Sequence, residues 1–153
     1  MKYSFNCCGH EHITAKHKTT LEFTKDTEMG LEGDCIVGVK ADFSLQQLKK
    51  FIKSVSNNKK ITIIIETINN KNNINKNKIN IIKNYNKIIE KINAEINPNF
   101  NSNEEMVIRK TDFVSERTFA IKANKAAFEL KRDLVEFLKG KENKIKVIIE
   151  NDL

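Results

Sequence analysis

The chain has 153 residues, of which 39% are hydrophobic and 31% are charged, and this apolar content is enough for the core of one ordinary domain. Its three cysteines, two of them adjacent, are a poor basis for a disulfide framework, so we expect reduced thiols and a cytoplasmic protein. No stretch approaches the roughly 20 apolar residues of a membrane helix, and the N-terminus lacks the apolar run of a signal peptide, so neither a membrane partner nor export is expected.

The first strands are indicated by alternating polar and apolar residues. Residues 2–7 alternate in this way, which predicts a short half-buried strand. Residues 13–23 alternate again and predict a long strand or a bent hairpin arm, with His17 on the apolar face between Ala15 and Thr19. After a turn signal at Gly33 and Asp34, residues 35–39 predict a buried strand.

A helix and a further strand complete this part of the chain. Ser44 is a good helix N-cap, and Gln47 completes a capping box with it, because the two side chains can satisfy free backbone donors. The helix has an apolar stripe that consists of Leu45, Leu48, Phe51, Ile52 and Val55. The Ile-rich residues 61–65 predict the strand that follows.

Residues 69–101 consist almost entirely of Asn, Ile and Lys, and we interpret them as an insertion between two halves of a single domain that spans residues 1–153. Pro98 would end a helix predicted at residues 78–96. A disordered loop and a partner-binding helix are the alternatives. The apolar residues that share one face of the predicted helix are Ile81, Tyr85, Ile88, Ile92 and Ile96.

The net charge of +7 is unevenly distributed. Residues 69–101 hold six Lys against two Glu, whereas the rest of the chain has 21 basic and 18 acidic residues. Clustered Lys and Arg favour nucleic-acid binding because they release counterions from phosphates. Since most of the excess lies in one unusual segment, the charge alone is weak evidence for such a partner.

The second half resembles the first in its predicted elements. Residues 106–109 and 118–121 predict strands, and residues 145–149 predict a final Ile-rich strand. Between them, Leu130, Leu134, Phe137 and Leu138 indicate a helix that stops before Gly140, a favoured residue just past a helix end.

Short stretches of the two halves can be matched. Residues 17–21 parallel residues 109–113, and residues 39–42 parallel residues 121–124. We interpret the chain as a duplicated strand-strand-helix-strand unit. This match pairs His17 with Arg109, so a pseudo-two-fold axis would bring both side chains towards one shared site.

Residues 9–22 (GHEHITAKHKTTLE) and 33–42 (GDCIVGVKAD) resemble an archaeal family catalogued as domain of unknown function 371. So do residues 109–113 (RKTDF), Arg117-Thr118 and Ala126-Ala127. The resemblance covers residues 3–66 and 105–149, while the Asn-rich segment lies outside the pattern. It implies an archaeal, cytoplasmic protein and supplies no catalytic residue, because the family has no established activity.

The Gly33-Asp34 turn, followed by strand, helix and strand, is also similar to the turn of cradle-loop barrels. That resemblance implies a pseudo-two-fold, β-rich α+β domain in the form of a six-stranded barrel, with the inserted helix outside it. The second half has Ser115 and Glu116 at the corresponding place. A layered α+β sandwich is therefore the alternative, and neither fold transfers a function.

Six residues are candidates for a ligand-binding site: His10, His17, Asp34, Arg109, Asp112 and Arg117. The two histidines could act as acid or base, or could be structural. Asp34 could be a turn cap or a general base, and Asp112 could be part of a salt-bridged turn. The two arginines together could hold a phosphate or a carboxylate. No Cys or His spacing supports a metal site, and no cofactor motif is present.

Two classes of function remain open at this level. The favoured one is a binding module for an anionic small molecule or nucleic acid near His17, Arg109 and Arg117. The alternative is a small enzyme that uses His10 or His17 as acid or base, with Asp34 nearby. The cofactor and the oligomeric state stay unknown.

Overall fold

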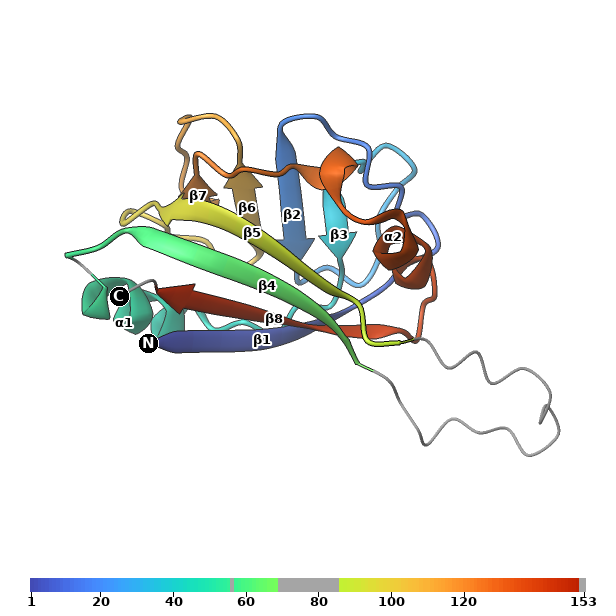
Figure 1. Ribbon diagram of the computed structural model, residues 1–153, viewed down its shortest axis with the longest axis horizontal. Helices are drawn as coiled ribbons and strands as arrows, with labels where there is room; N and C mark the ends of the chain where they lie inside the picture. The colour runs from blue at the N-terminus through green and yellow to red at the C-terminus, as the bar shows by residue number, and fades with distance from the viewer. Residues whose placement is uncertain (56, 69–85, 152–153) are drawn as a thin grey trace, which may run out of the picture.

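The computed structural model describes residues 1–55, 57–68 and 86–151, which form one mixed eight-stranded sheet with two α-helices and a short 3₁₀ helix (Figure 1). The expected β-rich α+β class is therefore confirmed. The strand order in the sheet is β1-β8-β4-β5-β7-β6-β2-β3. In chain order the elements are β1 (Lys2–Cys8), β2 (Thr20–Thr24), β3 (Ile36–Gly38), α1 (Leu45–Ser54), β4 (Lys60–Ile68), β5 (Ile89–Ile96), β6 (Glu105–Arg109), β7 (Thr118–Ile121), η1 (Ala127–Glu129), α2 (Arg132–Leu138) and β8 (Lys144–Asn151).

The sheet has a long-stranded part and a short-stranded part. Strands β1, β8, β4 and β5 are antiparallel neighbours, and in Figure 1 the short strands β7, β6, β2 and β3 stand above them. At the centre of the short part β2 pairs antiparallel with β6. Each of these strands also has a parallel partner, β3 for β2 and β7 for β6.

The outermost strands of the sheet approach each other at one point. Cys8 and Val39 exchange two backbone hydrogen bonds of 2.8 and 2.9 Å. This bridge does not extend into a ladder, so the sheet that the described residues form is open. The expectation of a six-stranded barrel is therefore wrong, both in strand number and in closure.

The core is built from strand residues that alternate with period two and from the apolar faces of the helices. Aromatic rings meet edge to face within it, Phe5 with Phe23 at 5.5 Å and Phe100 with Phe119 at 5.4 Å between ring centroids. Such geometry is favoured by the quadrupoles of the rings. In β2 the residues on both faces are buried, so its polar side chains also lie inside the molecule.

Most elements lie where the sequence predicts them. The N-cap of α1 is confirmed, since Ser44 Oγ accepts a hydrogen bond from the Gln47 backbone N–H at 3.3 Å. Gly140 follows the end of α2, as predicted. The predicted strands at residues 2–7, 35–39, 61–65, 106–109, 118–121 and 145–149 correspond to β1, β3, β4, β6, β7 and β8.

Two predicted elements are wrong. Residues 89–96 form strand β5 between β4 and β7, not a helix, while residues 69–85 lie outside the described part of the chain. Ile92, Ala94 and Ile96 are buried with period two, and pairing with β4 decided between two patterns that this Ile-rich sequence satisfies equally. Residues 13–19 are a loop in place of a strand, and Ala15 has a left-handed φ of 48°.

The backbone of the two halves is hydrogen-bonded in the same way at several points. The Asn6 N–H donates to Asp42 Oδ1 at 2.7 Å, and the Asn93 N–H donates to Asn124 Oδ1 at 2.9 Å. Asn6 lies in β1 and Asn93 lies in β5, so these two strands occupy corresponding places in the two halves. Each of them is followed in the chain by three more strands and an α-helix.

This correspondence changes the register of the predicted match. The Ala41 N–H donates to the Thr24 carbonyl, and the Ala123 N–H donates to the Arg109 carbonyl. Lys40 and Lys122, one residue before these donors, have left-handed φ angles of 54° and 52°. Thr24 is therefore the counterpart of Arg109, and the predicted pairing of His17 with Arg109 is wrong.

We expect Gly9→Ala to destabilise the fold by about 3 kcal/mol or more, because overpacking against rigid backbone is poorly relieved. A methyl group at this position would collide with the carbonyl oxygens of Leu138 and Gly140. Gly30→Ala is the matched control, since nothing lies within 4 Å of the added carbon. Urea unfolding measures both changes, and equal midpoints for the two variants would contradict the packing of β1 against the end of α2.

Candidate functional site

Glu22 is a buried acid at the centre of the short-stranded part of the sheet. It lies in the middle of β2, directly opposite Val107 of β6. Its neighbours Leu21 and Phe23 point into the core, so the Glu22 side chain projects from the other face of the sheet. Only 6% of the residue is exposed, and its Oε1 is a buried atom without a hydrogen-bond partner. Such an atom is costly unless a ligand or a proton compensates for it.

Arg117 is the nearest cation to this carboxyl group. It immediately precedes β7, and its Nη1 lies 2.7 Å from Glu105 Oε2 and 3.6 Å from Glu22 Oε1. The Arg117 side chain is half-exposed, at 53%. The same guanidinium thus contacts one carboxylate at hydrogen-bond distance and a second, more deeply buried one at a longer ion-pair distance.

Cys35 contacts Glu22 from the opposite side. The Cys35 thiol donates to Glu22 Oε2 across 3.9 Å. The Cys35 carbonyl accepts from the Glu22 N–H, just as the Arg117 carbonyl accepts from the Val107 N–H, both at 2.9 Å. Cys35 and Arg117 therefore occupy corresponding backbone positions, one in each half, on the two sides of Glu22.

Burial and the charge of Glu105 raise the pKa of Glu22 to about 7, although the charge of Arg117 acts in the opposite direction. The hydrogen bond from Arg117 lowers the pKa of Glu105. Near neutral pH the negative charge thus resides on Glu105, while Glu22 is poised between its acid and its carboxylate. Burial, followed by the charge of Glu22, raises the pKa of Cys35 to about 11, so this thiol stays protonated.

A second guanidinium belongs to the same cluster. Arg109 lies at the end of β6, its Nε donates to Thr118 Oγ1 at 3.0 Å, and its Cζ lies 5.0 Å from the centroid of the Phe113 ring. Burial, followed by the charge of Arg117, lowers the pKa of Arg109. Among the described residues Arg109 has no ion-pair partner, so its remaining N–H groups can receive an anion.

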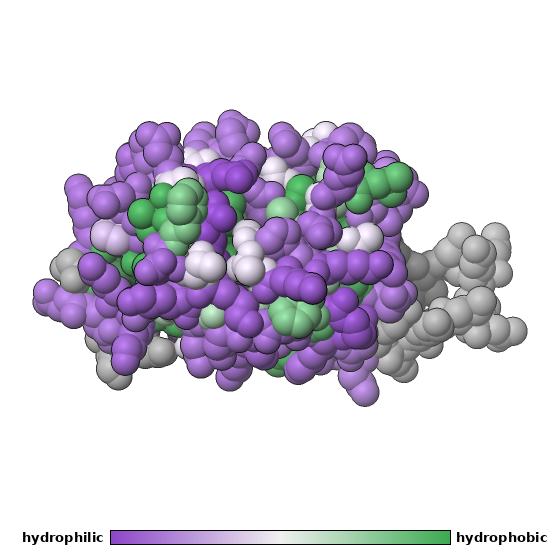
Figure 2. All heavy atoms as spheres, turned by 90° about the horizontal axis from the view of Figure 1, so that it is seen from above, coloured by the Kyte–Doolittle hydropathy of each residue, from purple (hydrophilic) through white to green (hydrophobic). Residues whose placement is uncertain are grey.

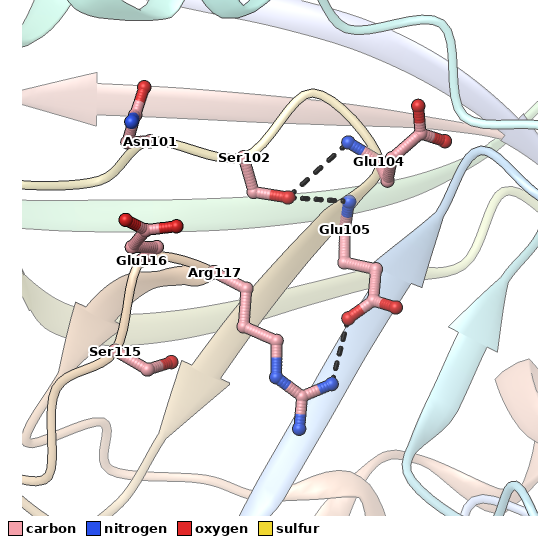
Figure 3. A pocket seen from close by; sticks show the side chains of 7 residues that line it. All are labelled: Asn101, Ser102, Glu104, Glu105, Ser115, Glu116 and Arg117. Carbon is pink, nitrogen blue, oxygen red and sulfur yellow. Dashed lines mark hydrogen bonds and ion pairs between the residues drawn. The ribbon is translucent and has the colours of Figure 1, made fainter.

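Arg117 also borders an open, polar pocket of about 490 Å³ (Figure 3). Figure 3 shows Arg117 reaching towards Glu105, while the carboxylate of Glu104 points away from it. Ser102 Oγ accepts the backbone N–H groups of Glu104 and Glu105 and so shapes the start of β6. The lining residues are Asn101, Ser102, Glu104, Glu105, Ser115, Glu116 and Arg117.

His10 belongs to a different part of the molecule. It is buried, its Nε2 lies 2.9 Å from Glu28 Oε2, and its Nδ1 accepts the His12 backbone N–H at 3.0 Å. His12 Nδ1 in turn lies 2.9 Å from the Met29 carbonyl. These bonds fix the bend after β1 against residues 28–29. No group of three or more potential metal ligands occurs in the described ranges.

His17 also has a local role in the backbone. It is half-buried, and its Nδ1 accepts the N–H groups of Thr19 and Thr20 at 3.2 and 3.1 Å. The imidazole therefore caps the start of β2. The Asp34 carbonyl accepts the His17 N–H at 3.2 Å, and the charge of Asp34 contributes to the raised pKa of Cys35.

Of the six residues proposed from the sequence, the structure brings Arg109 and Arg117 together, while Asp112 is exposed in the loop that follows β6. Sequence reasoning missed Glu22, Cys35 and Glu105 as members of the cluster. In the alternation of residues 13–23, Glu22 falls on the face opposite to His17, which predicts that it faces solvent, and nothing in the pattern indicates that this face is also covered. A charged residue between Leu21 and Phe23 was the available signal.

The fold and the cluster define a β-rich α+β protein with a buried carboxyl group next to two guanidinium groups. The chain belongs to the family described as Domain of unknown function (DUF371), whose model matches residues 5–152. This confirms the resemblance that its motifs indicate.

The uncharacterized protein MJ0206 of Methanocaldococcus jannaschii is similar to this chain along its whole length. The two are 34% identical over 151 residues, which is 97% of this chain and 100% of the relative. No helix within the described residues is long and apolar enough to cross a membrane.

We expect Glu22→Gln to increase stability at alkaline pH. In the wild type the unfolded chain ionises Glu22 near pH 4.5 but the folded protein only near pH 7, so the free energy of unfolding falls as pH rises through this window. Glutamine does not ionise, so the variant should gain about 1–3 kcal/mol over the wild type between pH about 4.5 and about 8. Urea unfolding across this range measures the gain. Glu104→Gln on the pocket rim is the control, and an equal slope for both variants would exclude the burial of Glu22.

Proposed function

We propose that this protein binds a small oxyanion, with a phosphate or carboxylate group, between Arg109 and Arg117. This proposal is supported by one observation: two guanidinium groups lie near the buried carboxyl group of Glu22, which readily takes up a proton. Guanidinium groups present paired N–H donors whose geometry matches such oxygens.

The charge of the cluster favours an anion. Arg109 and Arg117 carry two positive charges, and Glu105 neutralises one of them. When Glu22 is protonated, a net charge of about +1 remains on Arg109, which lacks an ion pair among the described residues. In a half-buried site such a charge attracts an anion more strongly than the same charge would in bulk water.

The side chain of Arg109 is also held in place before a ligand binds. Its Nε bond to Thr118 and its contact with the ring of Phe113 hold the guanidinium before a ligand arrives. Thr118 Oγ1 also accepts the Ser115 N–H at 3.1 Å, which ties the loop to the start of β7. Prior ordering of this kind increases affinity because less side-chain entropy is lost on binding.

A small ligand is favoured by the size of the pocket that Arg117 borders, about 490 Å³. Figure 2 shows mostly hydrophilic side chains on the face seen from above, with apolar groups in separate patches. Of the Asn-rich residues 69–101, the structure describes residues 86–101, and Ile89–Ile96 among them form strand β5 of the sheet. For the enzyme alternative, no contact among the described residues joins His10 to His17 or Asp34, and the thiol of Cys35 is protonated at neutral pH.

We also propose that the chain arose by internal duplication and acts in the cytoplasm. The duplication is supported by equivalent hydrogen bonds in the two halves. The bond of Asn6 corresponds to that of Asn93, and the bond of Thr24 corresponds to that of Arg109. The location is supported by the three free cysteines, Cys7, Cys8 and Cys35.

Arg109→Gln and Arg117→Gln should each weaken the binding of inorganic phosphate by about 10- to 100-fold, the usual cost of losing one charged hydrogen bond. Isothermal titration calorimetry at low ionic strength measures this loss. Lys139→Gln is the control, because Lys139 pairs with Glu136 on the surface of another part of the molecule. Unchanged affinity in both arginine variants, or no phosphate binding by the wild type, would contradict the proposed function.

A further inference from the structure

Glu22 Oε1 is an unusual atom in this site. It is the one buried side-chain nitrogen or oxygen of the described residues that has no hydrogen-bond partner, although Arg117 Nη1 lies 3.6 Å away. The other oxygen, Oε2, already accepts from the Cys35 thiol. An ionised carboxylate offers only acceptors, whereas its protonated form offers one donor. Without a ligand, the group with which Glu22 can share a proton is the hydrogen-bonded carboxylate of Glu105, and a ligand oxygen at Oε1 would take over that role.

Resting on the proposed oxyanion site, we infer that Glu22 shares one proton with the bound oxyanion, so that the site selects hydrogen phosphate over sulfate once Glu22 is ionised. Because Oε1 is buried, neighbouring side chains such as the half-exposed Arg117 must move aside for a ligand oxygen to reach it. In either direction a single hydrogen bond then forms between Glu22 Oε1 and that ligand oxygen. The proton comes from Glu22 when the carboxyl group is neutral, and from the ligand when Glu22 is a carboxylate. No other bond forms or breaks.

The discrimination follows from the number of protons on each anion. Hydrogen phosphate keeps an O–H group near neutral pH and can donate it to the Glu22 carboxylate. Sulfate has no proton, so it can only turn an acceptor towards a negatively charged oxygen. Two acceptors facing each other in a buried site lack a hydrogen bond and repel each other.

The groups that face Glu22 set the pH at which this selection begins. On β6 they are Glu105 and Arg109, before β7 Arg117, and before β3 Cys35 with the charge of Asp34 behind it. Thr20 and Thr24 are the neighbours on the same face of β2, and they carry no charge. Burial and Glu105 together raise the pKa of Glu22 to about 7, so selection should begin near neutral pH.

The test measures the affinity of the full chain for sulfate and inorganic phosphate at pH about 6 and about 8.5, by calorimetry at constant ionic strength. Sulfate affinity should fall about 30-fold between these values, as expected for a ligand that requires a protonated group with a pKa near 7. Phosphate affinity should change less than about threefold, because the ligand brings its own proton. A parallel fall for both anions would overturn the inference.

Methyl phosphate distinguishes free phosphate from a phosphate ester as the preferred ligand. A phosphate monoester loses its second proton near pH 6, so at pH about 8.5 it should behave like sulfate. Retention of methyl phosphate binding at that pH would overturn the proton-sharing scheme. If no oxyanion binds the wild type even at pH about 6, the proposed function itself fails, which is a different result.

Glu22→Gln provides the decisive variant. Its amide can donate to either anion at any pH, so sulfate binding should become independent of pH and the discrimination at pH about 8.5 should disappear. Glu142→Gln, at an exposed position between α2 and β8, should retain the wild-type behaviour. Urea unfolding at both pH values confirms that the variants are folded. Loss of discrimination in Glu142→Gln, or its persistence in Glu22→Gln, would overturn the role of Glu22.

Discussion

The antiparallel pairing of β2 with β6 is the contact on which both the sheet and the candidate site depend. It joins the two halves of the chain at the centre of the short strands, with Glu22 opposite Val107. Each of the two strands brings a parallel neighbour, and the residues just before those neighbours are Cys35 and Arg117. The thiol and the guanidinium therefore reach the same carboxyl group from two sides because the backbone is arranged alike in both halves.

The burial of Glu22 links the stability of the fold to its chemistry. Moving a carboxyl group out of water disfavours its ionised form, and the longer ion pair with Arg117 only partly offsets this cost because Arg117 is closer to Glu105. The result is a protonatable group with a pKa of about 7, surrounded by two cations. A hydrophobic residue would pack at this place at lower cost, so the presence of a carboxyl group here fits a role in binding.

The family is described as a domain of unknown function, and the archaeal relative MJ0206 is named as an uncharacterized protein. The chemistry of the site therefore follows from the contacts between its side chains. The histidines that attract attention in the sequence turn out to organise backbone, His10 and His12 at the bend after β1 and His17 at the start of β2. The cluster around Glu22 has the features of a ligand site instead: burial, an unpartnered oxygen and converging cations.

The sequence by itself determined most local structure of this protein. Alternation predicted β1, Ile-rich runs predicted β4 and β8, and Ser44 predicted where α1 begins, because these signals depend on neighbouring residues alone. Arg109 and Arg117 were also proposed from the sequence as a pair of guanidinium groups that could hold an anion, although the match of Arg109 with His17 was wrong.

Only the tertiary structure decided the remaining features, because they depend on partners distant in the chain. Pairing with β4 made residues 89–96 a strand. The backbone hydrogen bonds made Thr24, not His17, the residue that corresponds to Arg109 in the other half. Strand periodicity says which residues share a face, but coverage of both faces of β2 comes from other segments. For that reason Glu22, which looks like a solvated acid in the sequence, became the buried centre of the candidate site.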